Sequence, residues 1–132
     1  MSNVIFEIPK DATRIWDLEV PIVVNAKEKS IKMFFSGPIE EPFNYNEACY
    51  LLETADEDTT VDLYINCPGG VIDSAFMLTN AIKRCKAKVI GHLTGTVASA
   101  GTIIALSCDE LEAAPHLSFM IHNYSGGIQG KG

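Results

Sequence analysis

The sequence predicts a single domain of the α/β class, because strand-like and helix-like segments alternate along most of the chain. From residue 31 onward, helical segments over residues 46–54, 72–84 and 99–107 separate runs with strand character. The connections are short, and repeated strand–helix–strand units imply parallel strands joined by right-handed crossovers. A length of 132 residues suits one domain with one hydrophobic core.

The part of the chain before the first predicted helix contains one clear strand. Residues 1–30 carry short apolar runs interrupted by polar residues and two prolines, which favours short strands or a hairpin. Residues 31–35 form a β-rich run, and the turn Ser36-Gly37-Pro38 follows it. We therefore expect the regular part of the fold to begin at residue 31.

The middle of the chain predicts two helices around a strand. Residues 46–54 favour a helix, with Asn44 or Asn46 as its N-cap. Residues 61–66 alternate in the way of a strand. The next helix is expected to end near Arg84, because apolar residues recur at helical spacing before it. The apolar face of that helix consists of Ile72, Ala75, Phe76, Thr79 and Ile82.

The last third of the chain predicts a strand, a helix and a strand. Residues 88–94 and residues 119–122 have strand character. Residues 99–107 are small and apolar, which favours a helix buried nearly all round.

Charge and composition argue against several classes of function. The net charge of −7 disfavours nucleic-acid binding, which depends on clustered lysine and arginine. One basic cluster lies where a predicted helix ends, so it is expected to complement the helix dipole. This cluster is Lys83, Arg84, Lys86 and Lys88. The sequence has no signal-peptide pattern and no long apolar run, so we expect a cytoplasmic protein without membrane contact.

The cysteines favour free thiols. They are Cys49, Cys67, Cys85 and Cys108. None of them occurs in a Cys-x-x-Cys spacing, so the sequence indicates neither a zinc site nor a redox motif. We expect no metal and no other cofactor.

Two short motifs are candidates for catalytic chemistry. The turn Pro68-Gly69-Gly70 follows a predicted strand, and its N–H groups can face a carbonyl oxygen, although most Gly-Gly pairs are simply tight turns. Ser99 begins a predicted helix between small residues, which admits a substrate backbone and places free N–H groups near a developing oxyanion. Taken alone, Ser99 is more typical of an N-cap.

A serine nucleophile needs a base, and His122 is the candidate. A lone histidine at a strand end is more often a structural hydrogen-bonding group, the role expected of His92 and His116. The chain ends ten residues after His122, and no carboxylate follows it. The aspartates that precede it are expected to be loop or cap residues. These are Asp62, Asp73 and Asp109.

In combination, these motifs resemble the Clp peptidase family, the proteolytic subunit of ATP-dependent Clp proteases. The matching segments are Asn66-Cys67-Pro68-Gly69-Gly70, Ala98-Ser99-Ala100-Gly101 and Met120-Ile121-His122. The resemblance covers residues 31–130 and leaves residues 1–30 as a divergent N-terminal segment of one domain, residues 1–132. It implies an α/β fold of repeated ββα and βαβ units, of the type that Clp peptidases share with crotonases.

The resemblance implies a serine endopeptidase with Ser99 as nucleophile and His122 as general base. Gly70 and Ala100 would donate their backbone N–H groups to the oxyanion, and Val71 would pair its backbone with an extended peptide. Ser99 would attack the peptide carbonyl, and water would release the acyl-enzyme. Peptides or unfolded proteins are the implied substrates. An AAA+ unfoldase and further copies of the chain in a ring are the implied partners.

The chain also departs from the family pattern. The family's catalytic aspartate lies beyond a helical handle that joins two rings, and this chain ends before that handle. We therefore expect a truncated, largely inactive peptidase with an open groove, as a monomer or at most a single ring. Residues 1–30 lack the family's amphipathic helix, which counts against docking to an unfoldase.

Two other functions stay open at this point. A non-catalytic Clp-like subunit or adaptor would keep the scaffold without the chemistry. An acyl-CoA enzyme of the crotonase type would share the fold and the two-donor oxyanion hole, but it would not need Ser99 and His122.

Overall fold

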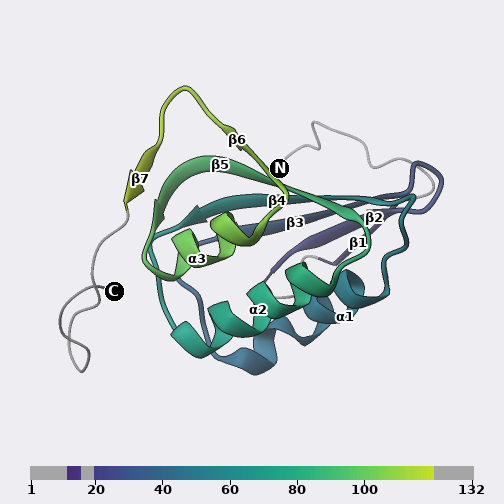
Figure 1. Cartoon of the computed structure of the whole chain (residues 1–132), viewed down its shortest axis with the longest axis horizontal. Coiled ribbons are helices and arrows are strands. Elements are labelled where there is room, and N and C mark those ends of the chain that lie inside the picture. The colour runs from purple at the N-terminus through teal and green to yellow at the C-terminus, as the bar shows by residue number, and fades with distance from the viewer. Residues whose placement is uncertain (1–11, 16–19, 121–132) are drawn as a thin grey trace, which may run out of the picture.

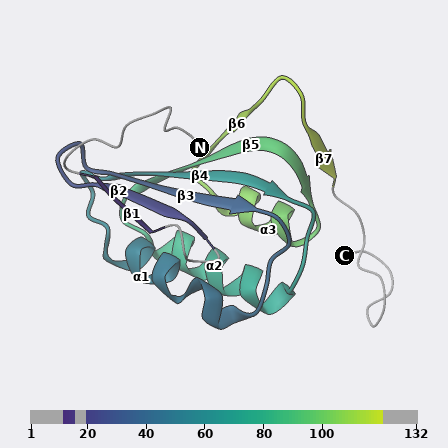
Figure 2. The same cartoon turned by 180° about the vertical axis from the view of Figure 1, so that it is seen from behind.

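A seven-stranded sheet with its helices on one side makes up the described part of the chain (Figures 1 and 2). The structure is a computed structural model and describes residues 12–15 and 20–120. The strands are β1 (Ala12–Ile15), β2 (Ile22–Asn25), β3 (Ser30–Ser36), β4 (Thr60–Cys67), β5 (Lys88–Ala98), β6 (Glu110–Ala113) and β7 (Ser118–Met120). The helices are the 3-10 helix η1 (Pro42–Tyr45), α1 (Asn46–Thr54), α2 (Ile72–Arg84) and α3 (Ala100–Ser107).

The centre of the sheet is parallel, as the alternation of strands and helices predicts. The strand order is β1-β2-β3-β4-β5-β6, and β7 also pairs with β5. In the parallel part, Ile31 pairs with Val61, and Val61 pairs with Val89. Ahead of it, β1, β2 and β3 are antiparallel, which confirms the expectation of short strands in the N-terminal segment. The α/β prediction is therefore confirmed.

One face of the sheet supplies the core. Alternate residues of β3, β4 and β5 point toward the helices, and Met33, Leu63 and Val89 are fully buried there. Small residues of α2, among them Ala75 and Ala81, let this helix pack closely on the sheet. Burial of this apolar face is the main stabilising contribution of the fold.

Two details of the helices differ from the prediction. Neither Asn44 nor Asn46 caps α1, because the chain already turns helically at η1, which begins with Pro42. Asn44 instead donates to the carbonyl of Glu41, and Asn46 is the first residue of α1.

The apolar face predicted for α2 is wrong at Phe76, whose surface is 47% exposed. The buried residues of α2 are Ser74, Ala75, Leu78, Ala81 and Ile82. Phe76 follows Ala75 directly, so it lies about 100° farther around the helix and points away from the sheet.

Two strands in the last third of the fold go beyond the prediction. β5 continues past residue 94 to Ala98, and β6 was not predicted because it has only four residues and all of them are exposed. Most of α3 is buried as expected, although Leu106 is 55% exposed. β7 confirms strand structure up to Met120, and residues 121–122 lie outside the described residues.

Candidate active site

Ser99 occupies a sharp turn between β5 and α3. Its backbone has φ 55° and ψ −123°, a conformation that non-glycine residues rarely adopt. Ser99 occupies the N-cap position of α3, but its side chain makes no capping hydrogen bond to the helix. Strained residues of this kind cluster at active sites, and a serine in such a strand-to-helix turn presents its hydroxyl outward.

The Pro68-Gly69-Gly70 turn lies directly against Ser99. A Cβ atom added to Gly69 would be 2.9 Å from the Cβ of Ser99 and 3.3 Å from its Oγ. Any side chain at position 69 would therefore crowd the Ser99 hydroxyl, and glycine leaves it open. The structure thus brings together two motifs that are 30 residues apart in the sequence.

Ile39 fixes the orientation of the Gly70 peptide. Its N–H donates to the carbonyl of Gly69 at 2.7 Å, and its carbonyl accepts from Val71 at 3.0 Å. Successive peptide groups of an extended segment point to opposite sides, so the N–H of Gly70 points away from Ile39. Among the described residues, none accepts that N–H. The sequence does not predict this role of Ile39, because the role depends on backbone hydrogen bonds and not on the side chain. The turn Ser36-Gly37-Pro38 before it is the only sequence signal near this position.

The first turn of α3 supplies the other candidate donors. The N–H groups of Thr102 and Ile103 both donate to the carbonyl of Ser99. The N–H groups of Ala100 and Gly101 precede any acceptor within the helix. A helix N-terminus favours negative charge, so the N–H of Ala100, next to Ser99 in the chain, is a candidate donor to an oxyanion.

Val71 has little backbone left for a substrate. Its N–H donates to Ile39, and its carbonyl accepts from Ala75 at the start of α2. The half-buried side chain is therefore the part of Val71 that can contact a peptide.

The segment that leads to His122 lies beside the Ser99 turn. In the β5–β7 pairing, Ala98 is opposite Met120. The Thr102 hydroxyl also donates to the carbonyl of Met120 at 2.9 Å. These contacts hold the last described residue of the chain against α3, and His122 itself lies outside the described residues.

Burial disfavours the reactive thiolate form of the cysteines. Cys67 packs beneath the site, where a Cβ on Gly101 would lie 3.1 Å from its sulfur. Burial raises the pKa of Cys67, and it raises the pKa of Cys108 to about 12. A protonated thiol is a poor nucleophile, so Ser99 is the nucleophile candidate at this site. All four cysteines are free, as predicted.

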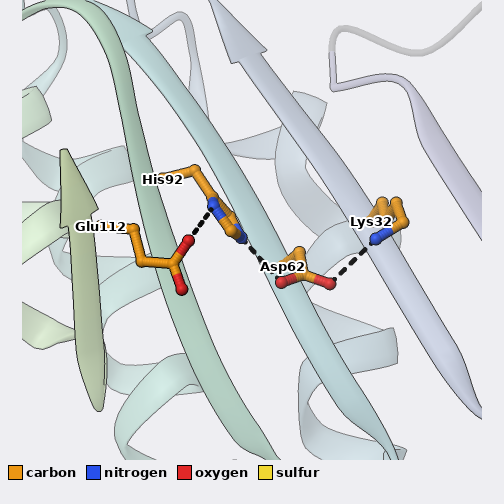
Figure 3. A network of polar contacts seen from close by, with 4 residues as sticks. All are labelled: Lys32, Asp62, His92 and Glu112. Atoms are coloured by element: carbon orange, nitrogen blue, oxygen red, sulfur yellow. Dashed lines mark hydrogen bonds and ion pairs between the residues drawn. The ribbon is translucent and has the colours of Figure 1, made fainter. Parts of the chain in front are cut away.

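A second polar cluster crosses the other face of the sheet (Figure 3). Asp62 accepts from Lys32 at 3.0 Å and contacts His92 Nε2 at 2.7 Å, and His92 Nδ1 lies 3.3 Å from Glu112. His92 is structural as predicted, but the prediction for Asp62 is wrong, because this residue lies within β4 and only 12% of its side chain is exposed. The cluster ties four strands together, because its members come from β3, β4, β5 and β6.

Replacement of Asp62 by asparagine is expected to destabilise the protein at neutral pH but not in acid. Burial raises the pKa of Asp62, but hydrogen bonds from His92 and Lys32 outweigh burial and hold the pKa below its usual value of about 3.9. A carboxyl with a depressed folded-state pKa contributes stability above its unfolded-state pKa and loses it as the pH falls through the folded-state pKa. Urea unfolding of both proteins from about pH 7 to about pH 2.5 measures this difference. A difference that does not shrink below about pH 4 would contradict it.

Neither a metal-binding cluster of side chains nor a membrane-spanning helix occurs among the described residues. Within residues 12–15 and 20–120, no group of three histidine, cysteine, aspartate or glutamate side chains is arranged to hold a metal ion. No helix in the same part of the chain is long and apolar enough to cross a membrane.

Curated relatives of this chain are proteolytic subunits. The chain is 33% identical over 103 residues to ATP-dependent Clp protease proteolytic subunit 2 of Pseudomonas aeruginosa, which covers 75% of this chain and 51% of that protein. It is 33% identical over 105 residues to proteolytic subunit 3 of Rhizobium johnstonii, with 77% and 54% covered. The chain thus spans about half the length of the curated relatives that it matches.

Solved structures and a family model agree with these relatives. A ClpP1 mutant from Listeria monocytogenes matches with a TM-score of 0.58 and 29% identity, over 72% of this chain and 57% of that one. The ClpP protease catalytic domain from Plasmodium falciparum has the same fold, with a TM-score of 0.63 and 21% identity over 76% and 57%. The Clp protease family model matches residues 21–132. With Ser99 and the Gly69-Gly70 turn in contact at the end of the parallel sheet, these matches show that the chain belongs to the Clp protease family.

Proposed function

We propose that this chain is a serine endopeptidase domain whose reaction is hydrolysis of peptide bonds through an acyl-enzyme, with Ser99 as the nucleophile and His122 as the general base. The observation that carries the proposal is the conformation of Ser99, with φ 55° and the Gly69-Gly70 turn against its side chain. Such a turn exposes the hydroxyl, and the adjacent backbone N–H groups can stabilise the charge that its attack creates. Membership of a protease family supports the same reaction class.

The proposed reaction proceeds in two stages. The Ser99 Oγ atom attacks the peptide carbonyl while His122 takes its proton, and the oxyanion accepts hydrogen bonds from the N–H groups of Gly70 and Ala100. The C–N bond then breaks, and the amine leaves with the proton that His122 held. Water, activated by the same histidine, attacks the ester and releases the acid with free Ser99.

The proposed substrate is an extended peptide or an unfolded protein segment. The turn at Gly70 offers a backbone donor, and the side chain of Val71 is the adjacent contact for a substrate residue. Because the curated relatives are subunits of ATP-dependent proteases, an AAA+ unfoldase is the proposed partner class, with further copies of the chain as subunits of a ring.

A fluorophosphonate probe tests the proposed nucleophile. This probe reacts with activated serines and should modify the folded wild-type protein, whereas Ser99→Ala should not react. Ser118→Ala serves as the matched control, because Ser118 is an exposed serine on β7 and should leave the reaction unchanged. A folded wild-type protein that does not react would favour the non-catalytic subunit, and acyl-CoA binding in calorimetry would favour the crotonase-type enzyme.

A further inference from the structure

β5 contains an irregularity just before Ser99. Ile65 of β4 pairs with Leu93, but Cys67 pairs with Val97, so Asn66 alone faces the three β5 residues from Thr94 to Thr96. A bulge of this kind bends a strand and redirects the side chains that follow it. Here the residues that follow are Val97, Ala98 and Ser99.

The side chain of Asn66 fills this bulge. Its Oδ1 atom accepts a hydrogen bond from the N–H of Thr96 at 2.9 Å. Gly95 makes room for the carboxamide, since a Cβ atom there would lie 2.5 Å from Oδ1. The Asn66 side chain thus replaces a hydrogen bond between β4 and β5 that the bulge removes. The residue that it bonds, Thr96, lies three residues before Ser99.

The backbone of Asn66 reaches the other half of the site. Its carbonyl accepts from the N–H of Gly37 at 2.9 Å, in the turn that leads to Ile39. Ile39 in turn holds the carbonyl of Gly69 and the N–H of Val71. Asn66 therefore contacts both the strand that leads to Ser99 and the loop that orients Gly70.

We infer that Asn66 is a positioning residue, whose side-chain oxygen sets the β5 bulge and thereby aligns Ser99 with the Gly70 donor. The inference rests on the proposed function for its effect on reactivity, but the bulge itself can be measured independently. Asn66 touches neither substrate nor reacting atoms in this account. It acts through the backbone of Thr96.

Three variants separate positioning from simple stability. Asn66→Ala removes the acceptor, and the fluorophosphonate reaction should slow about 10- to 100-fold, since small misplacements of reacting groups have effects of this size. Asn66→Asp keeps an acceptor oxygen and should restore most of the rate. Asp109→Ala is the matched control, because Asp109 accepts the N–H of Val89 at 2.8 Å at the opposite end of β5. It should lower the thermal midpoint comparably without changing the rate.

Hydrogen exchange of the Thr96–Ser99 amides supplies the independent readout. Asn66→Ala should accelerate exchange there, whereas Asn66→Asp and Asp109→Ala should not. Equal reaction rates in Asn66→Ala and the wild type, or unchanged exchange, would overturn the inference. If the wild type does not react at Ser99, the proposed function fails instead, and exchange still decides whether Asn66 holds the bulge.

A double-mutant cycle with Gly95 tests the contact itself. Gly95→Ala places a methyl group against the Asn66 carboxamide and should slow the reaction as Asn66→Ala does. In the Asn66→Ala background the obstruction is gone, so Gly95→Ala should add little further loss. If the double variant instead shows the product of the two single rate reductions, the two residues do not act through this contact, and the inference is overturned.

Discussion

Gly70→Ala is expected to lower the free energy of unfolding by more than about 3 kcal/mol, through backbone strain and two lost hydrogen bonds. Gly70 has φ 138°, and an added Cβ would lie 2.2 Å from the carbonyl oxygen of Ile39. The turn would have to move away from Ile39, which breaks the bonds to Gly69 and Val71. The displaced N–H would no longer serve an oxyanion, so the fluorophosphonate reaction should also fall by about 10²- to 10³-fold.

Gly37→Ala is the matched control for the Gly70 substitution. Gly37 has a similar φ of 132°, but an added Cβ would meet nothing within 4 Å. It should therefore show the conformational strain alone, about 1–3 kcal/mol, without the collision. Urea unfolding and probe reaction rates of both variants give the comparison. Equal destabilisation by the two substitutions would contradict the account of the Ile39 contact.

His122→Ala is expected to slow the fluorophosphonate reaction by about 10²- to 10⁴-fold, the usual contribution of a general base. The reason is that the Ser99 hydroxyl must lose its proton as it attacks, and a serine without a base is a weak nucleophile. Reaction rates at several probe concentrations measure the loss.

His116→Ala controls for the loss of a histidine nearby. His116 is exposed and lies six residues before His122. It should leave both the rate and the thermal midpoint close to those of the wild type. If His122→Ala reacts as fast as the wild type, another group activates Ser99 and the proposed role of His122 is wrong.

Strand and helix periodicity predicts most of the sheet. The core consists of apolar residues that recur at strand or helix spacing, and this spacing is visible in the sequence. The bounds of α1 and α2 agree with the predicted ranges. β6 escapes prediction because it is held by pairing with β5 and buries no apolar face. The cap of α1 was misplaced because η1 starts the helical turn before the asparagines.

The site was only partly predictable for a different reason. Ser99 and the glycine turn stand out by residue type, but the features that shape their surroundings are backbone contacts. The bond pair at Ile39 and the bulge opposite Asn66 depend on strand register, which no single residue reveals. The same applies to Asp62, whose partners Lys32 and His92 come from neighbouring strands.

Trapping an acyl-enzyme tests the central claim most directly. A p-nitrophenyl ester of a short peptide should acylate the folded protein, and mass spectrometry of proteolytic fragments should place the acyl group on Ser99. Ser99→Ala should carry none, while Ser118→Ala should be acylated like the wild type. An acyl group on any other residue, or no acylation of the folded wild-type protein, would contradict the assignment of Ser99 as a peptidase nucleophile.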